Sequence, residues 1–173
     1  DYIVATLHRP GNVDDPQVAA DLVAVVHEAA GIADIVLPLH PRGRAVLEAL
    51  GIGDHPRVHV VEPLGYIDFM SLVRGSLAVI TDSGGVQEES TVLGVPCLTL
   101  RPNTERPVTI SHGTNQLVTT HSLPAALAEQ VALRREQPDR LAPPTRIPPL
   151  WDGHAGERIA HLIVDWLDDR YAR

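Results

Sequence analysis

Short apolar runs alternate with amphipathic stretches along most of the chain. Residues 2–7 form a run typical of a buried strand, and residues 16–30 then repeat apolar positions at helical spacing. Four apolar residues of this stretch are expected to share one helical face: Val18, Leu22, Val25 and Ala29. Asp15 is positioned to cap the start of this helix, and Gly31 can end it. The first unit is therefore predicted to be a strand followed by a helix packed on a sheet.

The same strand-then-helix pattern recurs along the chain. Further strands are predicted at residues 35–39, 58–61, 77–81, 97–100 and 117–119. Further helices are predicted at residues 42–50, 66–74, 86–93, 123–135 and 155–168. This alternation predicts the α/β class, a three-layer Rossmann-like domain with a mainly parallel sheet of about six strands.

Proline breaks the pattern near the C-terminus. Five prolines fall within a dozen residues: Pro138, Pro143, Pro144, Pro148 and Pro149. Because proline cannot donate a backbone hydrogen bond, this stretch predicts an extended connector. We therefore expect a Rossmann-like domain at residues 1–136, a connector at 137–150 and a C-terminal helical segment at 151–173.

Composition narrows the classes of partner. The chain carries 14 Lys and Arg against 22 Asp and Glu, a net charge of −8 that repels nucleic acid and anionic membranes. Cys97, the single cysteine, cannot form an internal disulfide, and no apolar run approaches the roughly 20 residues of a membrane helix. These features favour a cytoplasmic protein. The chain also opens at Asp1 directly on a predicted strand, which favours a domain taken from a longer polypeptide.

A glycine turn follows the strand predicted at residues 77–81. Ser83, Gly84 and Gly85 lead into a helix whose first N–H groups have no internal acceptor, so a phosphate can bind there. The turn lacks the lysine of a P-loop and does not match the GxGxxG dinucleotide fingerprint. An equally good alternative is an ordinary turn capped by Asp82 or Ser83.

Charged residues flank this turn. Glu88 and Glu89 lie one turn further along the helix, where a carboxylate can bind a ribose diol or simply complement the helix dipole. Arg101 and Arg106 follow the next strand, and arginine binds phosphate well. The alternative is that Glu105 pairs with a neighbouring arginine.

Two histidines follow the first and second strands. His8 and His40 are expected to point into the same crevice, because the carboxyl ends of parallel strands share one edge of the sheet. A histidine at a strand end is nevertheless often a hydrogen-bonded structural residue.

Taken together, these segments resemble the non-hydrolysing UDP-N-acetylglucosamine 2-epimerases. The matching segments are Leu7-His8-Arg9 with Asn12, Pro38-Leu39-His40-Pro41, Pro63-Leu64-Gly65-Tyr66 with Phe69, Thr81 through Glu89, Arg101 with Thr104-Glu105-Arg106-Pro107, Gly113-Thr114-Asn115, and Asp152-Gly153 with Ala155, Arg158 and Ile159. The resemblance implies the C-terminal half of a two-domain glycosyltransferase-B type fold. It also implies elimination of UDP to give 2-acetamidoglucal, followed by re-addition to give UDP-N-acetylmannosamine, without a metal or redox cofactor.

The resemblance also implies a role for each site residue. Ser83, Gly84, Gly85 and Arg106 would hold the diphosphate, Glu89 the ribose and Phe69 the uracil, while His40 would lie in the UDP site. His8 matches the catalytic histidine of the family. Arg9 and His40 are candidates for a secondary, allosteric site, although Gly11 stands where many relatives have Glu.

The whole-protein expectations follow from the same resemblance. The catalytic carboxylates would lie in an N-terminal domain that this chain lacks, so the chain alone is expected to bind UDP weakly and to be inactive. The full-length enzyme is expected to be a homodimer in cell-envelope polysaccharide synthesis. A glycosyltransferase-B donor domain and an inactive nucleotide-sugar sensor remain alternatives.

The C-terminal helix is expected to pack towards the missing domain. In this chain its apolar residues would instead drive self-association or dock on the sheet domain; they are Trp151, Ile159, Leu162 and Trp166.

Overall fold

The computed structural model describes residues 1–137 and 147–171 and contains one six-stranded sheet in the order β3-β2-β1-β4-β5-β6. All pairings are parallel, which confirms the predicted fold class. The strands are β1 (Tyr2–Thr6), β2 (Asp34–Pro38), β3 (Val58–Val61), β4 (Val79–Thr81), β5 (Cys97–Leu100) and β6 (Asn115–Val118). The helices are α1 (Pro10–Val13), α2 (Pro16–Ala30), α3 (Pro41–Ala49), α4 (Tyr66–Gly75), α5 (Gly84–Leu93), α6 (Pro107–Ser111), α7 (Leu123–Arg135) and α8 (Ala155–Tyr171).

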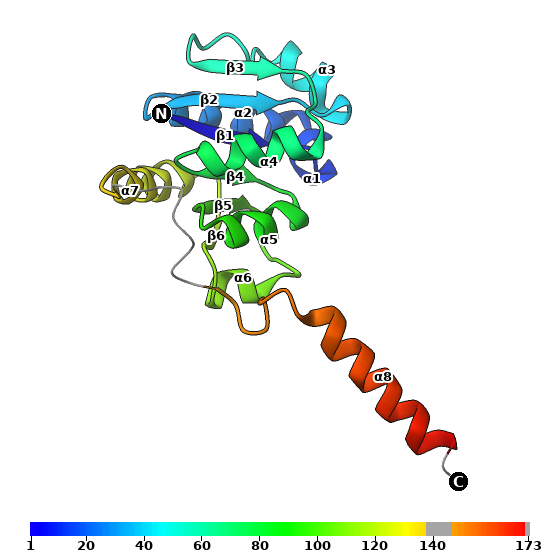
Figure 1. The fold of residues 1–173 in the computed structure, drawn as a ribbon. Coiled ribbons are helices and arrows are strands. Elements are labelled where there is room, and N and C mark those ends of the chain that lie inside the picture. The colour runs from blue at the N-terminus through cyan, green and yellow to red at the C-terminus, as the bar shows by residue number, and fades with distance from the viewer. Residues whose placement is uncertain (138–146, 172–173) are drawn as a thin grey trace.

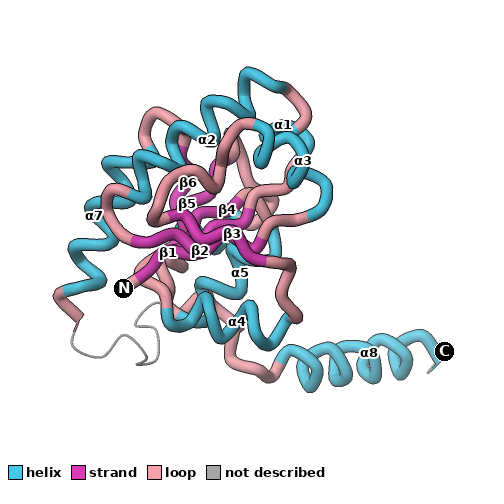
Figure 2. The backbone as a smooth tube through the Cα atoms, turned by 90° about the horizontal axis from the view of Figure 1, so that it is seen from above, coloured by secondary structure: helices cyan, strands magenta, loops and turns pink. Residues whose placement is uncertain are grey.

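Helices cover both faces of the sheet. Helices α1, α2, α3 and α7 pack together on one face, and α4 and α5 lie on the other, as the view from above shows (Figure 2). The inner strands β4 and β5 are buried at every residue, as expected for a parallel sheet covered on both sides, whereas the edge strands β3 and β6 are partly exposed. The larger core cluster lies under α2 and α7, and a smaller cluster lies under α4 and α5.

Helix α2 shows how local sequence sets an element. The Asp15 carboxylate accepts hydrogen bonds from the backbone N–H groups of Gln17 and Val18, so it caps the helix as predicted. Leu22, Val25 and Ala29 of the predicted face are buried. The Val18 side chain is 36% exposed, so its assignment to the buried face was wrong. It lies in the first turn, and the buried stripe begins at the next residue, Ala19.

The strand order reverses beside β1. β1 pairs with β2 on one side and with β4 on the other. The chain therefore leaves β1 and β4 towards opposite faces of the sheet. Ligands of open α/β sheets bind at such a switch point, beyond the carboxyl ends of the strands. The segments placed there are residues 7–9 after β1 and residues 82–83 after β4.

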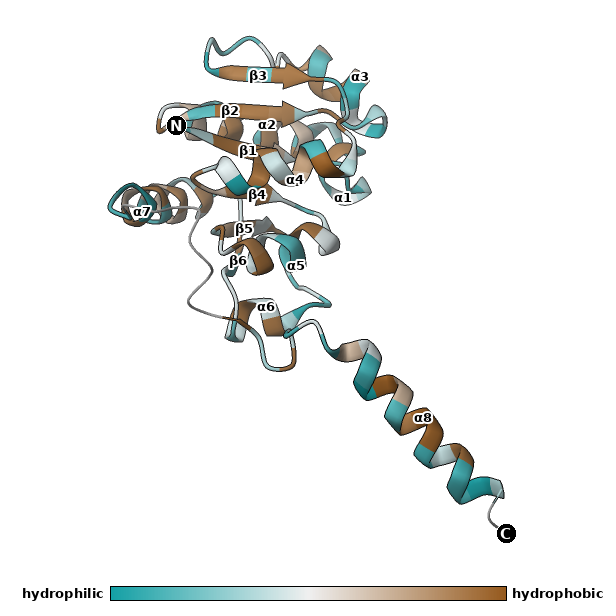
Figure 3. Ribbon diagram, in the orientation of Figure 1, coloured by the Kyte–Doolittle hydropathy of each residue, from teal (hydrophilic) through white to brown (hydrophobic). Residues whose placement is uncertain are grey.

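Helix α8 projects away from the sheet domain (Figure 1), and none of its residues is buried. Ile159 and Trp166 are each 56% exposed and Leu162 is 68% exposed, so docking on the sheet domain is not what the structure shows. Hydrophobic residues recur along the helix (Figure 3). Self-association and packing on another domain remain predictions. Residues 138–146 of the predicted connector lie outside the described residues. None of the helices within residues 1–137 and 147–171 is long and apolar enough to cross a lipid bilayer.

Candidate functional site

A buried carboxylate joins the two loops at the switch point. The Asp82 side chain is fully buried and accepts hydrogen bonds from the backbone N–H of His8 at 3.0 Å, the backbone N–H of Arg9 at 2.8 Å and Nδ2 of Asn12 at 3.0 Å. Asp82 therefore does not cap α5, which was one alternative for this turn. It instead ties the segment after β1 to the end of β4.

The same carboxylate orients His8. Nδ1 of His8 lies 3.2 Å from Oδ1 of Asp82, and the imidazole is 34% exposed. The two atoms are not aligned for a hydrogen bond, but a carboxylate that faces one ring nitrogen favours a proton on that nitrogen, which leaves the other nitrogen for a ligand. Asp82 thus holds the backbone of His8 and lies close to its Nδ1.

His40 lies beside His8, as predicted. The ring centroids are 5.4 Å apart and the planes are tilted by 39°. Nδ1 of His40 also accepts a hydrogen bond from the backbone N–H of Arg42 and so caps α3. His40 therefore has a structural role in addition to its place near His8.

The glycine turn presents uncapped backbone groups. Ser83 is the N-cap residue of α5 but its side chain makes no capping hydrogen bond, and its backbone N–H donates to Oγ1 of Thr81. Gly84 and Gly85 form the first turn, and a Cβ atom on Gly85 would have no neighbour within 4 Å. The first N–H groups of α5 can therefore bind an anion. At its other end α5 stops at Gly94, whose φ of 67° is left-handed.

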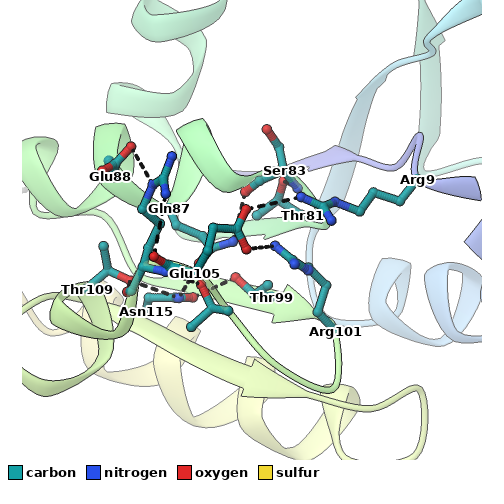
Figure 4. Close-up of polar contacts among 12 residues, drawn as sticks. Arg9, Thr81, Ser83, Gln87, Glu88, Thr99, Arg101, Glu105, Thr109 and Asn115 are labelled. Carbon is teal, nitrogen blue, oxygen red and sulfur yellow. Dashed lines mark hydrogen bonds and ion pairs between the residues drawn. The ribbon is translucent and has the colours of Figure 1, made fainter. Parts of the chain in front are cut away.

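The loop after β5 that carries Arg101 and Arg106, called the arginine loop below, brings Glu105 to the glycine turn. Oε2 of Glu105 lies 2.7 Å from Nη1 of Arg101, and Oε1 lies 3.3 Å from Nη2 of Arg9 (Figure 4). Its own backbone N–H and then the Arg101 guanidinium lower the pKa of the Glu105 carboxyl. The alternative in which Glu105 pairs with a neighbouring arginine is therefore what the structure shows. The contact with Arg9 was not foreseen.

Arg106 contacts helix α5 itself. Its Nε lies 3.0 Å from Oε2 of Glu88, with both side chains 39% exposed, but the atoms are not aligned for a hydrogen bond. Arg106 thus lies beside the first turns of α5, with its partner one residue before Glu89. Glu89 is partly buried on α5, and Phe69 on α4 is partly buried against the smaller core cluster.

A buried polar network supports the site. Gln87 Nε2 donates to the carbonyl of Ser83, while its Oε1 accepts from Oγ1 of Thr104 at 2.6 Å and from Nδ2 of Asn115 at 3.0 Å. Gln87 therefore connects the glycine turn to the arginine loop and to β6 (Figure 4). All three residues fall in segments that carry the family resemblance, but their mutual contacts had no sequence signal. Across the described residues, no three His, Cys, Asp or Glu side chains are grouped so as to bind a metal ion.

Comparison with known proteins identifies the family. The sequence pattern of the family described as UDP-N-acetylglucosamine 2-epimerase matches residues 1–164. The chain belongs to this family. It is 35% identical over 170 residues to a UDP-N-acetylglucosamine 2-epimerase of Methanocaldococcus jannaschii, covering 95% of this chain and 44% of the relative. It is also 44% identical over 118 residues to the UDP-2,3-diacetamido-2,3-dideoxy-D-glucuronate 2-epimerase of Pseudomonas aeruginosa, covering 68% of this chain and 33% of that relative.

A solved structure of the family shows the same fold. The M. jannaschii UDP-GlcNAc 2-epimerase in complex with UDP-GlcNAc and UDP superposes with a TM-score of 0.77 at 35% identity. The match covers 95% of this chain and 45% of that one. The chain therefore spans less than half the length of these epimerases.

Proposed function

We propose that this chain is the UDP-binding part of an isomerase that interconverts UDP-N-acetylglucosamine and UDP-N-acetylmannosamine. The observation that carries the proposal is the Asp82 junction, which holds His8, in the segment after β1, beside the uncapped N-terminus of α5. An anion-binding helix end and an oriented histidine at a switch point suit a substrate whose leaving group is a nucleoside diphosphate.

The diphosphate would bind at the first turn of α5. Gly84 and Gly85 would donate backbone hydrogen bonds, the Ser83 hydroxyl would donate another, and Arg106 would turn from Glu88 to a phosphate oxygen. The misaligned contact between Arg106 and Glu88 favours this exchange, because little hydrogen-bond energy is lost on leaving it.

The nucleoside would extend from the diphosphate along α5 and α4. Glu89 would accept the ribose hydroxyls and Phe69 would lie near the uracil. His40, whose ring is next to that of His8, would complete the wall of the site.

His8 would act on the bond between the sugar and UDP. Removal of the C2 proton by a base forms a C1–C2 double bond, while the C1–O bond breaks and its electron pair leaves with UDP. With Nδ1 facing Asp82, Nε2 of His8 is left for the departing phosphate oxygen, to which it would donate a hydrogen bond in the imidazolium form of the ring. Re-addition of UDP and of a proton from the other face of C2 gives the epimer.

The base is expected to come from a preceding domain. The chain spans 44% of its M. jannaschii relative, so carboxylates that remove the C2 proton can lie in the remainder. We therefore expect the chain alone to bind UDP without turnover. A homodimer, a cytoplasmic location and a role in cell-envelope polysaccharide synthesis are predictions for the whole protein.

Calorimetric titration with UDP tests the binding site. We expect Ser83→Ala combined with Arg106→Ala to weaken UDP binding by about tenfold or more, because a charge-assisted contact and a hydroxyl donor are lost. Arg57→Ala is the matched control, since Arg57 pairs with Asp34 at the opposite edge of the sheet. Equal UDP affinity in the double variant and the wild type would contradict the proposed site.

Product analysis on the whole protein tests the reaction. We expect UDP-N-acetylglucosamine to yield its C2 epimer, with exchange of the C2 proton for solvent deuterium. UDP-2,3-diacetamido-2,3-dideoxy-D-glucuronate should be tested as a second substrate, because the P. aeruginosa relative with 44% sequence identity is an epimerase of that compound. Transfer of the sugar to an acceptor would favour a glycosyltransferase, and binding without conversion would favour a sensor.

A further inference from the structure

The carboxylate of Glu105 lies against the glycine turn at the start of α5. A Cβ atom placed on Gly84 would be 2.7 Å from Oε1 of Glu105, so the oxygen contacts the glycine with no side chain between them. Glu105 belongs to the loop after β5, whereas Gly84 follows β4. The anion-binding end of α5 is thus covered by an anion of the same chain (Figure 4).

Two guanidinium groups hold this carboxylate from different elements. Nη1 of Arg101, a side chain only 10% exposed, lies 2.7 Å from Oε2 without the alignment of a hydrogen bond, and Nη2 of Arg9, from the segment after β1, lies 3.3 Å from Oε1. Two cations and a helix N-terminus around one anion are the environment that a phosphate group prefers. The Glu105 side chain is itself 42% exposed, so it can swing away without opening the core.

We propose that Glu105 is an internal occupant of the diphosphate site, which the phosphates of the ligand displace from Arg9, Arg101 and the Gly84 turn. This inference rests on the proposed function and adds a competing group to the same site. Two anions cannot share the pair of arginines without repulsion, so each binding event includes the cost of moving Glu105. Arg9 and Arg101 then become phosphate ligands beside Arg106.

A second interpretation of the same contacts predicts the opposite change in UDP affinity. If Glu105 served to hold Arg9 and Arg101 in place for the phosphate, its removal would weaken binding. The competition model instead requires that removing its charge strengthens binding. Glu105→Gln separates the two models because glutamine keeps the length of the side chain and loses the charge.

The experiment is titration of Glu105→Gln and Glu105→Ala with UDP and with uridine. UDP is expected to bind about three- to tenfold more tightly to both variants at low salt, the effect of removing one like charge from beside a phosphate. The gain should shrink as salt rises, because screening weakens the repulsion. Uridine, which has no phosphate, should bind the variants and the wild type equally.

Glu129→Gln is the matched control. Glu129 is exposed on α7, and this change alters the net charge equally, so UDP affinity should stay at the wild-type value. Thermal unfolding of each variant shows whether it is folded before titration. Unchanged or weaker UDP binding in a folded Glu105→Gln variant would overturn the inference and leave the proposed UDP site standing. Absence of UDP binding in the wild type and in every variant would overturn both.

Discussion

The Asp82 junction gives the sharpest test of how the site is held together. The perturbation is Asp82→Ala, which removes the acceptor of the His8 and Arg9 backbone N–H groups and of the Asn12 amide. Leaving a buried donor without an acceptor costs about 1–3 kcal/mol. These donors are only partly buried and water can satisfy some of the loss, so we expect the free energy of unfolding to fall by about 3–5 kcal/mol.

The assay is urea unfolding followed by circular dichroism. Tryptophan fluorescence would report the wrong region, because both tryptophans lie at residues 151 and 166, outside the sheet domain. Asp15→Ala is the control, since Asp15 is an exposed N-cap with two hydrogen bonds and should cost about 1 kcal/mol. Asp82→Asn should fall between the two, because it keeps one acceptor oxygen but turns an amide donor towards other donors.

A loss of stability in Asp82→Ala no larger than that in Asp15→Ala would contradict this expectation. Such a result would mean that the loop after β1 keeps its conformation without the carboxylate. The orientation of His8 would then need another cause.

Three further outcomes follow from the structure. Gly85→Ala should leave the free energy of unfolding unchanged or raise it by up to about 1 kcal/mol in urea unfolding, because the new methyl group meets no atom within 4 Å. The same methyl group should block close approach of a phosphate and so weaken UDP binding in calorimetry. Unimpaired UDP binding would argue against the α5 site. Burial raises the pKa of the Cys97 thiol to about 11, so a disulfide reagent at pH 8 should label the protein only after unfolding, and rapid labelling of the folded protein would show that the thiol is accessible. The hydrogen bond from Arg158 to Asp152 lowers the pKa of the Asp152 carboxyl from 3.8 to about 2. The stability that this pairing contributes is therefore fully present above pH 3.8 and is lost as the pH falls through about 2. Arg158→Ala should return that pKa towards 3.8 in an NMR titration of the carboxyl carbons, and an unmoved value would rule Arg158 out as the main cause.

Most of the fold was predictable because the signal is local. Strands buried on both faces appear as apolar runs, and the predicted bounds of β3, β5 and α7 agree with the structure to the residue. The short helices α1 and α6 were missed because four or five residues are too few for a helical period.

The site was predictable as a set of positions and not as a set of contacts. His8 and His40 were expected to point into one crevice, and their rings do lie next to each other, because the carboxyl ends of neighbouring parallel strands lie together. The fourfold use of Asp82 and the placement of Glu105 on Gly84 depend on side chains from separate elements. Asp82 follows a buried strand directly, a signal that was weighed only as a possible helix cap.

The position of the site at the reversal of strand order has a consequence for folding. The sheet divides into two half-sheets, β1 to β3 and β4 to β6, and the seam between them is the pairing of Val4, Ala5 and Thr6 with Val79, Ile80 and Thr81. A ligand that contacts both His8 and the start of α5 binds only when this seam is closed. By mass action, ligand at a hundredfold excess over its dissociation constant would favour the assembled domain by about 2.7 kcal/mol. If the proposed nucleotide binds there, its abundance would help to determine what fraction of the chain is correctly assembled.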